Sequence, residues 1–207
     1  PPRSTQSRSS AASDVYKRQR YQSWTAAKKV SKDTKPSMLV FKGDVYQGLE
    51  ADTLSKSEIS FAQKHIRILS GLYGILRPLD LMKPYRLEMG TKLQINGYKN
   101  LYEFWGEKIT NHLIEDCSED DVIVNLASNE YSKAINLKSF KNVVTPVFKD
   151  FKNGKSKVIS FFAKKARGSF ARFVIQEKPK KIDELLNFNG LGYQFTEITA
   201  SNEIIFS

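Results

Sequence analysis

The sequence predicts a single domain of mixed α/β or α+β class with a partly antiparallel sheet. Its apolar residues recur at helical spacing in some segments and form short strand-like runs in others. Hydrophobic residues make up 40% of the chain and aromatic residues 12%, which is enough for a packed core. A length of 207 residues suits one domain of ordinary size.

Residues 1–19 differ from the rest of the chain, because they are rich in Ser and Arg and show no apolar periodicity. Residues 9–19, SSAASDVYKRQ, match the translation of a transposase sequencing adapter at eleven consecutive positions. The alternatives are a disordered basic tail and a transit peptide. A transit peptide would need an amphipathic helix, and none can be drawn here. We therefore expect 1–19 to be a non-native, disordered tail and 20–207 to be the protein domain.

The first part of the domain is predicted as a strand, a turn and a helix. The apolar run SMLVF at 37–41 predicts a strand, and Gly43 and Gly48 bracket a turn behind it. Residues 55–58 have the spacing of a capping box, and apolar residues follow at three- and four-residue steps. This pattern predicts an amphipathic helix over 57–70.

The remaining elements follow from the same reasoning. The segment 71–78 ends the helix, since it contains two glycines and a proline. The expected order behind it is an irregular segment or short strand at 79–90, a helix at 100–117, a buried strand at 121–128, strands at 142–148 and 157–163 joined by the turn Asn153-Gly154, a helix at 163–177 with phenylalanines in the core, a short helix at 181–188, and a terminal hairpin of 193–198 with 202–206.

The formal net charge is +11, and +8 remains when residues 1–19 are set aside. Such a surplus suits a polyanionic partner, either nucleic acid or an anionic surface, although a basic protein without such a partner is also possible. No apolar run approaches the ~20 residues that cross a bilayer. The single cysteine, Cys117, excludes an internal disulfide, so we expect a cytoplasmic protein. With two histidines far apart in sequence, we expect no metal site and no cofactor.

The segment LSGLYGILRP is the first candidate for phosphate binding. Gly71 and Gly74 would leave backbone amides open to a phosphate, with Arg67 and Arg77 on either side. A helix followed by a glycine hairpin is the general plan of a helix-hairpin-helix DNA element, although that motif usually has one residue between its glycines. The alternative is a tight turn in which Gly71 caps the helix.

Other basic residues lie in three segments. Lys83 and Arg86 flank Tyr85, where phosphate and base contacts are possible, but Arg86 and Glu88 could equally form a surface ion pair. The helix at 163–177 carries a basic stripe beside Gly168, which could admit a partner or could simply be a solvated face. The residues of these segments are Lys42, Lys83, Arg86, Lys164, Lys165, Arg167 and Arg172.

Acidic and neutral polar residues support a different hypothesis, because plain DNA coating needs no carboxylates. A pocket of mixed charge would suit an enzyme acting on a nucleotide or nucleobase. Helix capping and surface ion pairs are the structural alternative. The candidates are Asp44, Glu88, Asn125, Ser128, Glu130 and Tyr131.

Several long motifs occur in a fixed order: FKGDVYQGL, LSGLYGILRPLDLMKPYRLEMG, LYEFWG, VIVNLASNEY and ISFFAKKARGSFARF. With them the chain from about residue 20 to its end resembles the YaaA family of bacterial peroxide-stress proteins. Members of that family typically begin with a strand and a Ser-Pro-Ala-Lys segment, which we expect 20–207 to lack.

The resemblance implies a single mixed α/β domain with a basic cleft and a helix-hairpin-helix-like element. It implies a cytoplasmic protein, which we expect to be a monomer, that binds duplex and branched DNA and limits peroxide damage. It also links the family to lower intracellular unincorporated iron. The hairpin maps onto Gly71, Gly74 and Arg77. The cleft maps onto Lys42, Arg67, Lys83, Arg86, Lys164, Lys165, Arg167 and Arg172. The sequence offers no Glu-x-x-His pair for storing iron, so an indirect effect on iron is expected.

Overall fold

The computed structural model describes residues 33–152 and 155–207 of the chain. The predicted non-native tail at 1–19 and the predicted turn Asn153-Gly154 lie outside the described residues.

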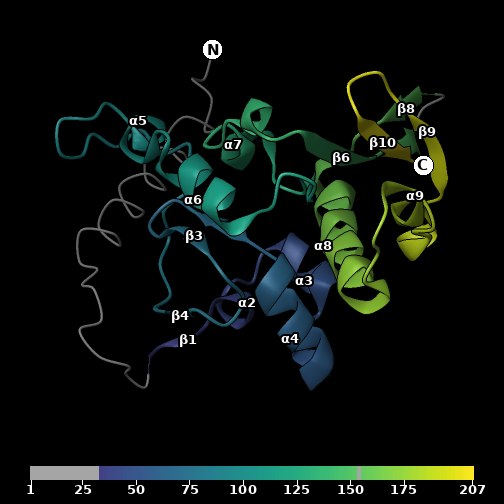
Figure 1. Ribbon diagram of the computed structural model, residues 1–207, viewed down its shortest axis with the longest axis horizontal. Coiled ribbons are helices and arrows are strands. Elements are labelled where there is room, and N and C mark those ends of the chain that lie inside the picture. The colour runs from purple at the N-terminus through teal and green to yellow at the C-terminus, as the bar shows by residue number, and fades with distance from the viewer. Residues whose placement is uncertain (1–32, 153–154) are drawn as a thin grey trace, which may run out of the picture.

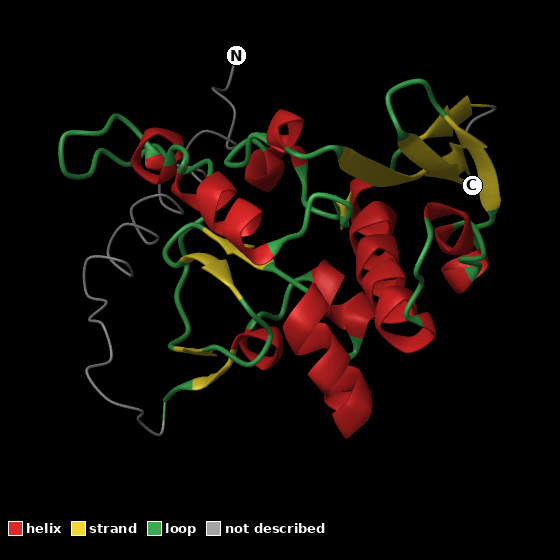
Figure 2. Ribbon diagram, viewed as in Figure 1, coloured by secondary structure: helices red, strands yellow, loops and turns green. Residues whose placement is uncertain are grey.

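Helices and short strands alternate along the chain (Figure 2). The α-helices are α2 (Ser37–Val40), α3 (Asp44–Leu49), α4 (Lys56–His65), α5 (Leu101–Trp105), α6 (Lys108–Asp116), α7 (Asn129–Ser132), α8 (Ser160–Glu177) and α9 (Ile182–Leu185). The strands are β1 (Lys35–Pro36), β2 (Ile68–Ser70), β3 (Gly74–Leu76), β4 (Leu81–Met82), β5 (Val122–Val124), β6 (Asn142–Phe148), β7 (Asp150–Lys152), β8 (Lys155–Lys157), β9 (Phe195–Ile198) and β10 (Glu203–Phe206). Short 3-10 turns lie at Ala51–Thr53, Leu137–Ser139 and Gly190–Gly192.

The main sheet has the strand order β5-β6-β10-β9. β6 pairs in parallel with both β5 and β10, whereas β9 pairs with β10 antiparallel. The strands β1 and β4, β2 and β3, and β7 and β8 form separate antiparallel pairs. These pairings confirm the predicted mixed α/β class with a partly antiparallel sheet.

Helix α8 joins the two halves of the molecule. Figure 1 shows it between the strands β6 and β10 on one side and the helices α3 and α4 on the other. Toward the sheet it contributes Phe170, which packs with the rings of Phe148, Phe188 and Phe206 in a fully buried cluster. The prediction that phenylalanines of this helix pack the core is confirmed for Phe170.

The same prediction is wrong for Phe161 and Phe162, whose side chains are exposed. The strand predicted at 157–163 is also wrong, because β8 ends at Lys157 and α8 begins at Ser160. Both phenylalanines therefore lie in the first turn of α8, before its buried face begins at Ala163. A short apolar run fits either a strand or a helix, so periodicity alone could not decide between them.

The strand predicted at 37–41 is instead the short helix α2. Its first backbone N–H groups donate to carbonyl oxygens in the loop after β3, so they are not free to pair with a neighbouring strand. The Ser37 N–H donates to the Asp80 carbonyl oxygen at 2.9 Å, and the Met38 N–H donates to that of Pro78 at 3.1 Å. The Ser37 hydroxyl, which is fully buried, donates to the Arg77 carbonyl oxygen at 2.7 Å. These contacts fix the segment as a turn of helix against residues 77–80.

The turn predicted between Gly43 and Gly48 is helix α3. Gly48 is buried against α8, because a Cβ at this position would overlap the Lys165 carbonyl oxygen. This glycine therefore permits close helix packing rather than a chain reversal. Asp44 lies in the first turn of α3, where a carboxylate interacts favourably with the helix dipole.

The amphipathic helix predicted at 57–70 is shorter than expected and ends at His65. Its predicted capping box is confirmed, since Ser55 Oγ accepts from the Glu58 N–H at 3.3 Å and Glu58 Oε2 accepts from the Ser55 N–H at 2.6 Å. Residues 68–70 leave the helical pattern because they pair with β3 in an antiparallel hairpin. The glycine segment thus joins two strands, and the prediction of a helix-hairpin-helix-like element is wrong here.

Most of the remaining predictions are confirmed. The helix predicted at 100–117 is divided into α5 and α6 at Gly106, which has a φ of +43°. The short strand in 79–90, the strand at 142–148, the helix at 163–177, the short helix at 181–188 and the terminal hairpin are found as β4, β6, α8, α9 and β9–β10.

Candidate nucleic-acid interface

The two glycines of the β2–β3 hairpin are packed inside the protein. A Cβ on Gly71 would overlap the Leu87 carbonyl oxygen, and one on Gly74 would meet the Trp105 ring. The Trp105 indole N–H donates to the Gly71 carbonyl oxygen at 3.0 Å. Gly74 has a φ of +75°, a conformation that favours glycine. The structure therefore explains both glycines by packing and backbone conformation.

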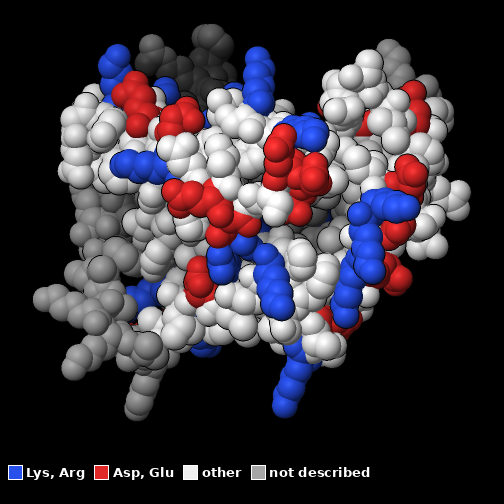
Figure 3. Space-filling model, in the orientation of Figure 1, with Lys and Arg blue, Asp and Glu red and all other residues white. Residues whose placement is uncertain are grey.

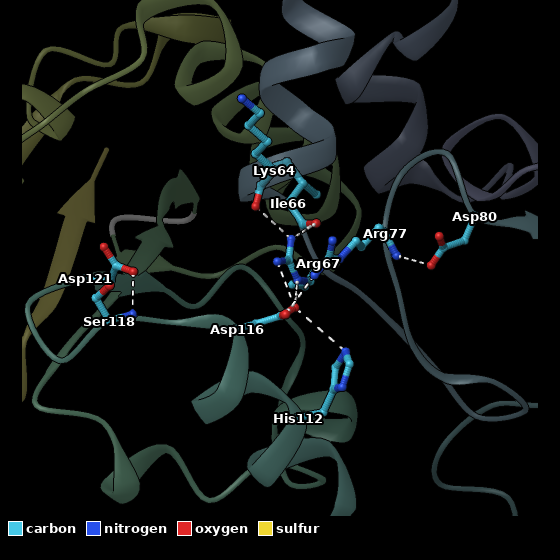
Figure 4. Close-up of polar contacts among 9 residues, drawn as sticks. All are labelled: Lys64, Ile66, Arg67, Arg77, Asp80, His112, Asp116, Ser118 and Asp121. Carbon is cyan, nitrogen blue, oxygen red and sulfur yellow. Dashed lines mark hydrogen bonds and ion pairs between the residues drawn. The ribbon is translucent and has the colours of Figure 1, made fainter.

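Arg67 and Arg77, which flank the hairpin, both bind Asp116 at the end of α6 (Figure 4). Asp116 Oδ2 lies 2.8 Å from Arg67 NH2, and Asp116 Oδ1 lies 2.7 Å from Arg77 NH2. Only 15% of the Asp116 side chain is exposed. Its burial raises the pKa of the carboxyl group, but hydrogen bonds from the two arginines and their charges outweigh this and lower the pKa overall.

A cavity of about 340 Å³ opens beside this ion-pair group. Its wall includes Gln63, Arg67, Arg77, Asp80 and His112. His112 Nε2 lies 3.8 Å from Asp116 Oδ2, and Arg67 also donates to the Lys64 and Ile66 carbonyl oxygens at 2.9 Å and 3.0 Å. The cations here are thus engaged within the chain, where they tie α4, the hairpin and α6 together.

Other predicted cations, most of them exposed, lie on segments that contact one another. The Phe41 ring lies 6.1 Å from the Tyr85 ring and 5.0 Å from the Tyr46 ring, so the segments that carry Lys42 and Arg86 pack against each other. Lys164 Nζ of α8 lies 3.9 Å from Asp44 Oδ2 at the start of α3. We call the following residues the basic cluster: Lys42, Lys83, Arg86, Lys164 and Lys165.

The ammonium groups of Lys42, Lys83 and Lys165 have no ion-pair partner among the described residues. Arg86 Nε lies 3.4 Å from Glu88 Oε1, so the ion pair considered in the sequence analysis does form. Its arginine side chain is nevertheless more than half exposed.

Arg167 and Arg172 of α8 bind carbonyl oxygens of their own chain. Arg167 Nη1 donates to the carbonyl oxygen of Leu126, two residues after β5, at 3.2 Å. Burial lowers the pKa of this arginine. Arg172 NH1 donates to the Leu49 and Glu50 carbonyl oxygens, each at 3.1 Å. It therefore satisfies carbonyl groups at the end of α3.

The prediction that Gly168 admits a partner is wrong. A Cβ at Gly168 would overlap the Val45 carbonyl oxygen, so the element that packs closely against this glycine is α3 of the same chain. Together with Gly48, this glycine lets α3 and α8 cross in direct backbone contact.

Some residues of the predicted mixed-charge pocket come together and others do not. Glu88 and Glu130 both raise the pKa of Tyr131, although the main cause of that shift is burial of the tyrosine hydroxyl. Glu130 Oε1 accepts from the Gly90 N–H at 2.8 Å. Asp44 is paired with Lys164 instead.

The remaining two residues of the predicted pocket lie at the end of β5. Asn125 Oδ1 accepts from the Ala127 N–H at 3.2 Å. Ser128 precedes α7, and its carbonyl oxygen accepts from the N–H groups of Tyr131 and Ser132. Both residues thus have local structural contacts.

A group of tyrosines that was not predicted as a unit packs between the segments that carry Lys42, Lys83 and Arg86. Burial raises the pKa of Tyr46, and it raises that of Tyr85 to about 12. The Tyr73 and Tyr85 rings lie 5.6 Å apart, and Tyr85 shares a hydrogen bond with Ser70. The density of tyrosines in these motifs was visible, but the sequence contained no signal that they meet.

Charges of both signs are intermixed on the face drawn in Figure 3. A continuous basic cleft, which the resemblance implied, is not apparent on that face. Within residues 33–152 and 155–207, no group of three or more His, Cys, Asp or Glu residues is placed to hold a metal ion. Within the same ranges, no helix combines the length and hydropathy needed to cross a membrane.

Comparison with known proteins places the chain in a family. A family model described as "Peroxide stress protein YaaA" matches residues 6–199. A UPF0246 protein of Aliivibrio fischeri is 54% identical over 181 residues, covering 86% of this chain and 70% of the relative. One from Idiomarina loihiensis is 55% identical over 174 residues, covering 83% and 67%. One from Shewanella amazonensis is 54% identical over 180 residues, covering 86% and 70%. The chain belongs to the YaaA family of peroxide stress proteins.

Proposed function

We propose that this protein binds duplex and branched DNA in the cytoplasm, as a monomer, and limits oxidative damage to it during peroxide stress. The basic cluster of Lys42, Lys83, Arg86, Lys164 and Lys165 would supply the phosphate contacts. Arg67, Arg77, Arg167 and Arg172 would act indirectly, by holding the elements that carry the cluster.

The packing of three separate segments that carry mostly exposed cations against one another carries this proposal. Lys42 precedes α3, Arg86 lies in the loop after β4, and Lys164 begins the second turn of α8. The Phe41–Tyr85 ring contact and the Lys164–Asp44 ion pair hold these segments next to one another. Cations so gathered can neutralise neighbouring phosphates of one DNA backbone, which is the main source of affinity in binding without sequence preference.

A double substitution tests the assignment of the cluster. Lys164→Ala with Lys165→Ala should weaken binding to all DNA sequences alike and lower the slope of log affinity against log salt by about 2, because two phosphate contacts are lost. The readout is fluorescence anisotropy of labelled duplex and four-way junction DNA at several salt concentrations.

The matched control is Lys180→Ala with Lys181→Ala, an exposed lysine pair before α9 and outside the cluster. It should leave the salt slope close to that of the unmodified protein. An equal loss in both double variants would mean that only net charge matters, and the assigned cluster would be wrong.

We further propose that the link to unincorporated iron is indirect. Calorimetric titration of the purified protein with ferrous iron under anaerobic conditions should show no stoichiometric binding. Tight binding near one ion per chain would contradict this part of the proposal.

An enzyme acting on a nucleotide or nucleobase is the second candidate function. It is favoured by the contact of Glu130 with the Gly90 N–H, two residues after Glu88, and by the charges of Glu88 and Glu130, which both raise the pKa of the half-buried Tyr131. Carboxyl and phenol groups in such a setting can serve as acid, base or substrate anchor. Incubation of DNA and nucleotides with the protein, followed by chromatography of the products, would support this candidate if a conversion appears and Glu88→Gln abolishes it.

A further inference from the structure

A cavity of about 660 Å³ lies at the start of α8, next to β7 and the carboxyl end of the chain. Its volume falls within the range of roughly 300–1,000 Å³ typical of sites for small organic ligands. Apart from Lys165, no residue of the basic cluster lines it.

Three exposed phenylalanines line this cavity. Phe151, Phe161 and Phe162 are exposed to 78%, 55% and 49% of their surface. The rings of Phe161 and Phe162 lie 5.6 Å apart with an interplanar angle of 67°, an edge-to-face arrangement that leaves ring surface for a further ring. Exposed aromatic side chains that gather around a hollow indicate a binding site more strongly than isolated ones.

Positive charge flanks these rings. Lys149 and Lys165 also line the cavity, and neither ammonium group has an ion-pair partner among the described residues. Aromatic faces beside cations match a ligand with flat rings and negative charges. Single-stranded nucleic acid has this chemistry, because its bases stack on aromatic side chains while its phosphates bind lysines.

Asp150, in the same wall, adds a hydrogen-bond acceptor. Its Oδ1 accepts from the Tyr193 hydroxyl at 2.9 Å. Its Oδ2 is buried and has no hydrogen-bond partner among the described residues. A buried acceptor without a hydrogen bond lowers the stability of the folded protein. The amino group of a base is a suitable donor for it, as when an aspartate accepts a hydrogen bond from cytosine N4.

We propose that this cavity binds an unpaired base of single-stranded DNA, stacked on Phe151, Phe161 or Phe162, with the adjacent phosphates on Lys149 and Lys165. The proposal rests on the DNA binding proposed above and extends it from the phosphate backbone to the base. In a duplex the base faces are already stacked on one another, so the cavity would act only on unpaired nucleotides.

The test uses the full chain and three fluorescein-labelled probes of equal length: oligodeoxycytidine, an abasic strand with the same phosphates, and a duplex. The variant Phe151→Ala with Phe161→Ala removes two stacking faces that are largely exposed. The matched control is Tyr98→Ala, an exposed tyrosine before α5 that does not line the cavity and whose ring lies 5.8 Å from Lys108 Nζ. Circular dichroism monitors the folding of each variant.

We expect the double variant to bind oligodeoxycytidine at least about tenfold more weakly, since loss of stacking on one base commonly costs 1–3 kcal/mol. Its affinity for the duplex should stay within about twofold of the unmodified protein, as should that of Tyr98→Ala for every probe. The unmodified protein should bind the abasic strand more weakly than oligodeoxycytidine, a comparison that does not depend on the folding of any variant.

Two outcomes would overturn the base-binding proposal, and they differ in what else they overturn. If the abasic strand binds as tightly as oligodeoxycytidine while the duplex binds, the cavity holds no base but DNA binding survives. If neither the duplex nor any single strand binds, the proposed function fails together with the base site.

Discussion

Asp116 determines what two of the predicted phosphate ligands can do. It accepts hydrogen bonds from Arg67 and Arg77, which lie on different sides of the β2–β3 hairpin, and it is itself mostly buried. Sequence reasoning found both arginines, because basic residues beside glycines are a recognisable pattern. It could not find their partner, since Asp116 is 39 positions from Arg77 and 49 from Arg67, and only the fold brings them together.

Removing the Asp116 charge should destabilise the protein. The substitution Asp116→Asn leaves two adjacent guanidinium groups without a counter-charge, and we expect a loss of about 2–3 kcal/mol in the free energy of unfolding. Urea denaturation followed by circular dichroism measures it. Asp120→Asn is the control, because the Asp120 carboxylate is 93% exposed in its contact with Lys141, and its loss should cost well under about 1 kcal/mol.

The same carboxylate should make stability depend on pH in the acid range. Its pKa is lowered in the folded state, so its contribution is present above the pKa of the unfolded chain, about 4, and is lost as pH falls through the lower folded value. The difference in unfolding free energy between the unmodified protein and Asp116→Asn should therefore shrink as pH falls from neutral to below about 4. A difference that stays constant over this range would show that the carboxylate charge is not the stabilising feature.

At the scale of elements, the crossing of α3 and α8 positions the basic cluster. The two helices meet at Gly48 and Gly168, and each glycine faces backbone atoms of the other helix. Helix α8 itself could be predicted, because its apolar residues recur over five turns. The short helix α3 could not, since two glycines in eight residues are more typical of a turn, and their role depends on a distant helix.

A methyl group at the crossing should separate the helices. Gly168→Ala places a Cβ against the Val45 carbonyl oxygen, and we expect a net loss of about 3 kcal/mol or more in the free energy of unfolding. This loss is opposite in sign to the gain that alanine usually gives inside a helix. Thermal unfolding in a calorimeter would measure it.

Gly43→Ala is the matched control for this substitution. A Cβ at Gly43 meets no atom within 4 Å, and its φ of −68° is open to alanine. Because Gly43 is the N-cap of α3, where glycine is preferred over alanine, its substitution should cost up to about 1 kcal/mol. Equal stability of Gly168→Ala and Gly43→Ala would contradict the proposed crossing.

For the whole molecule, the spacing of apolar residues predicted the class of fold, and composition predicted the surplus of positive charge. It could not predict how that charge is distributed. Arg67, Arg77, Arg167 and Arg172 are engaged within the chain, whereas the lysines of the basic cluster project from loops and helix starts. Residues that contribute equally to net charge therefore differ in how far they are engaged within the chain, and Arg86 belongs with the lysines of the cluster.

The central claim is that exposed cations bind DNA phosphates, and the salt dependence of affinity for duplex DNA tests it most directly. With five phosphate contacts, log affinity should fall linearly with log salt concentration at a slope of about −4.5. Anisotropy titrations between low and physiological salt would give this slope. An affinity that does not change over that range, or no measurable binding at low salt, would contradict the claim.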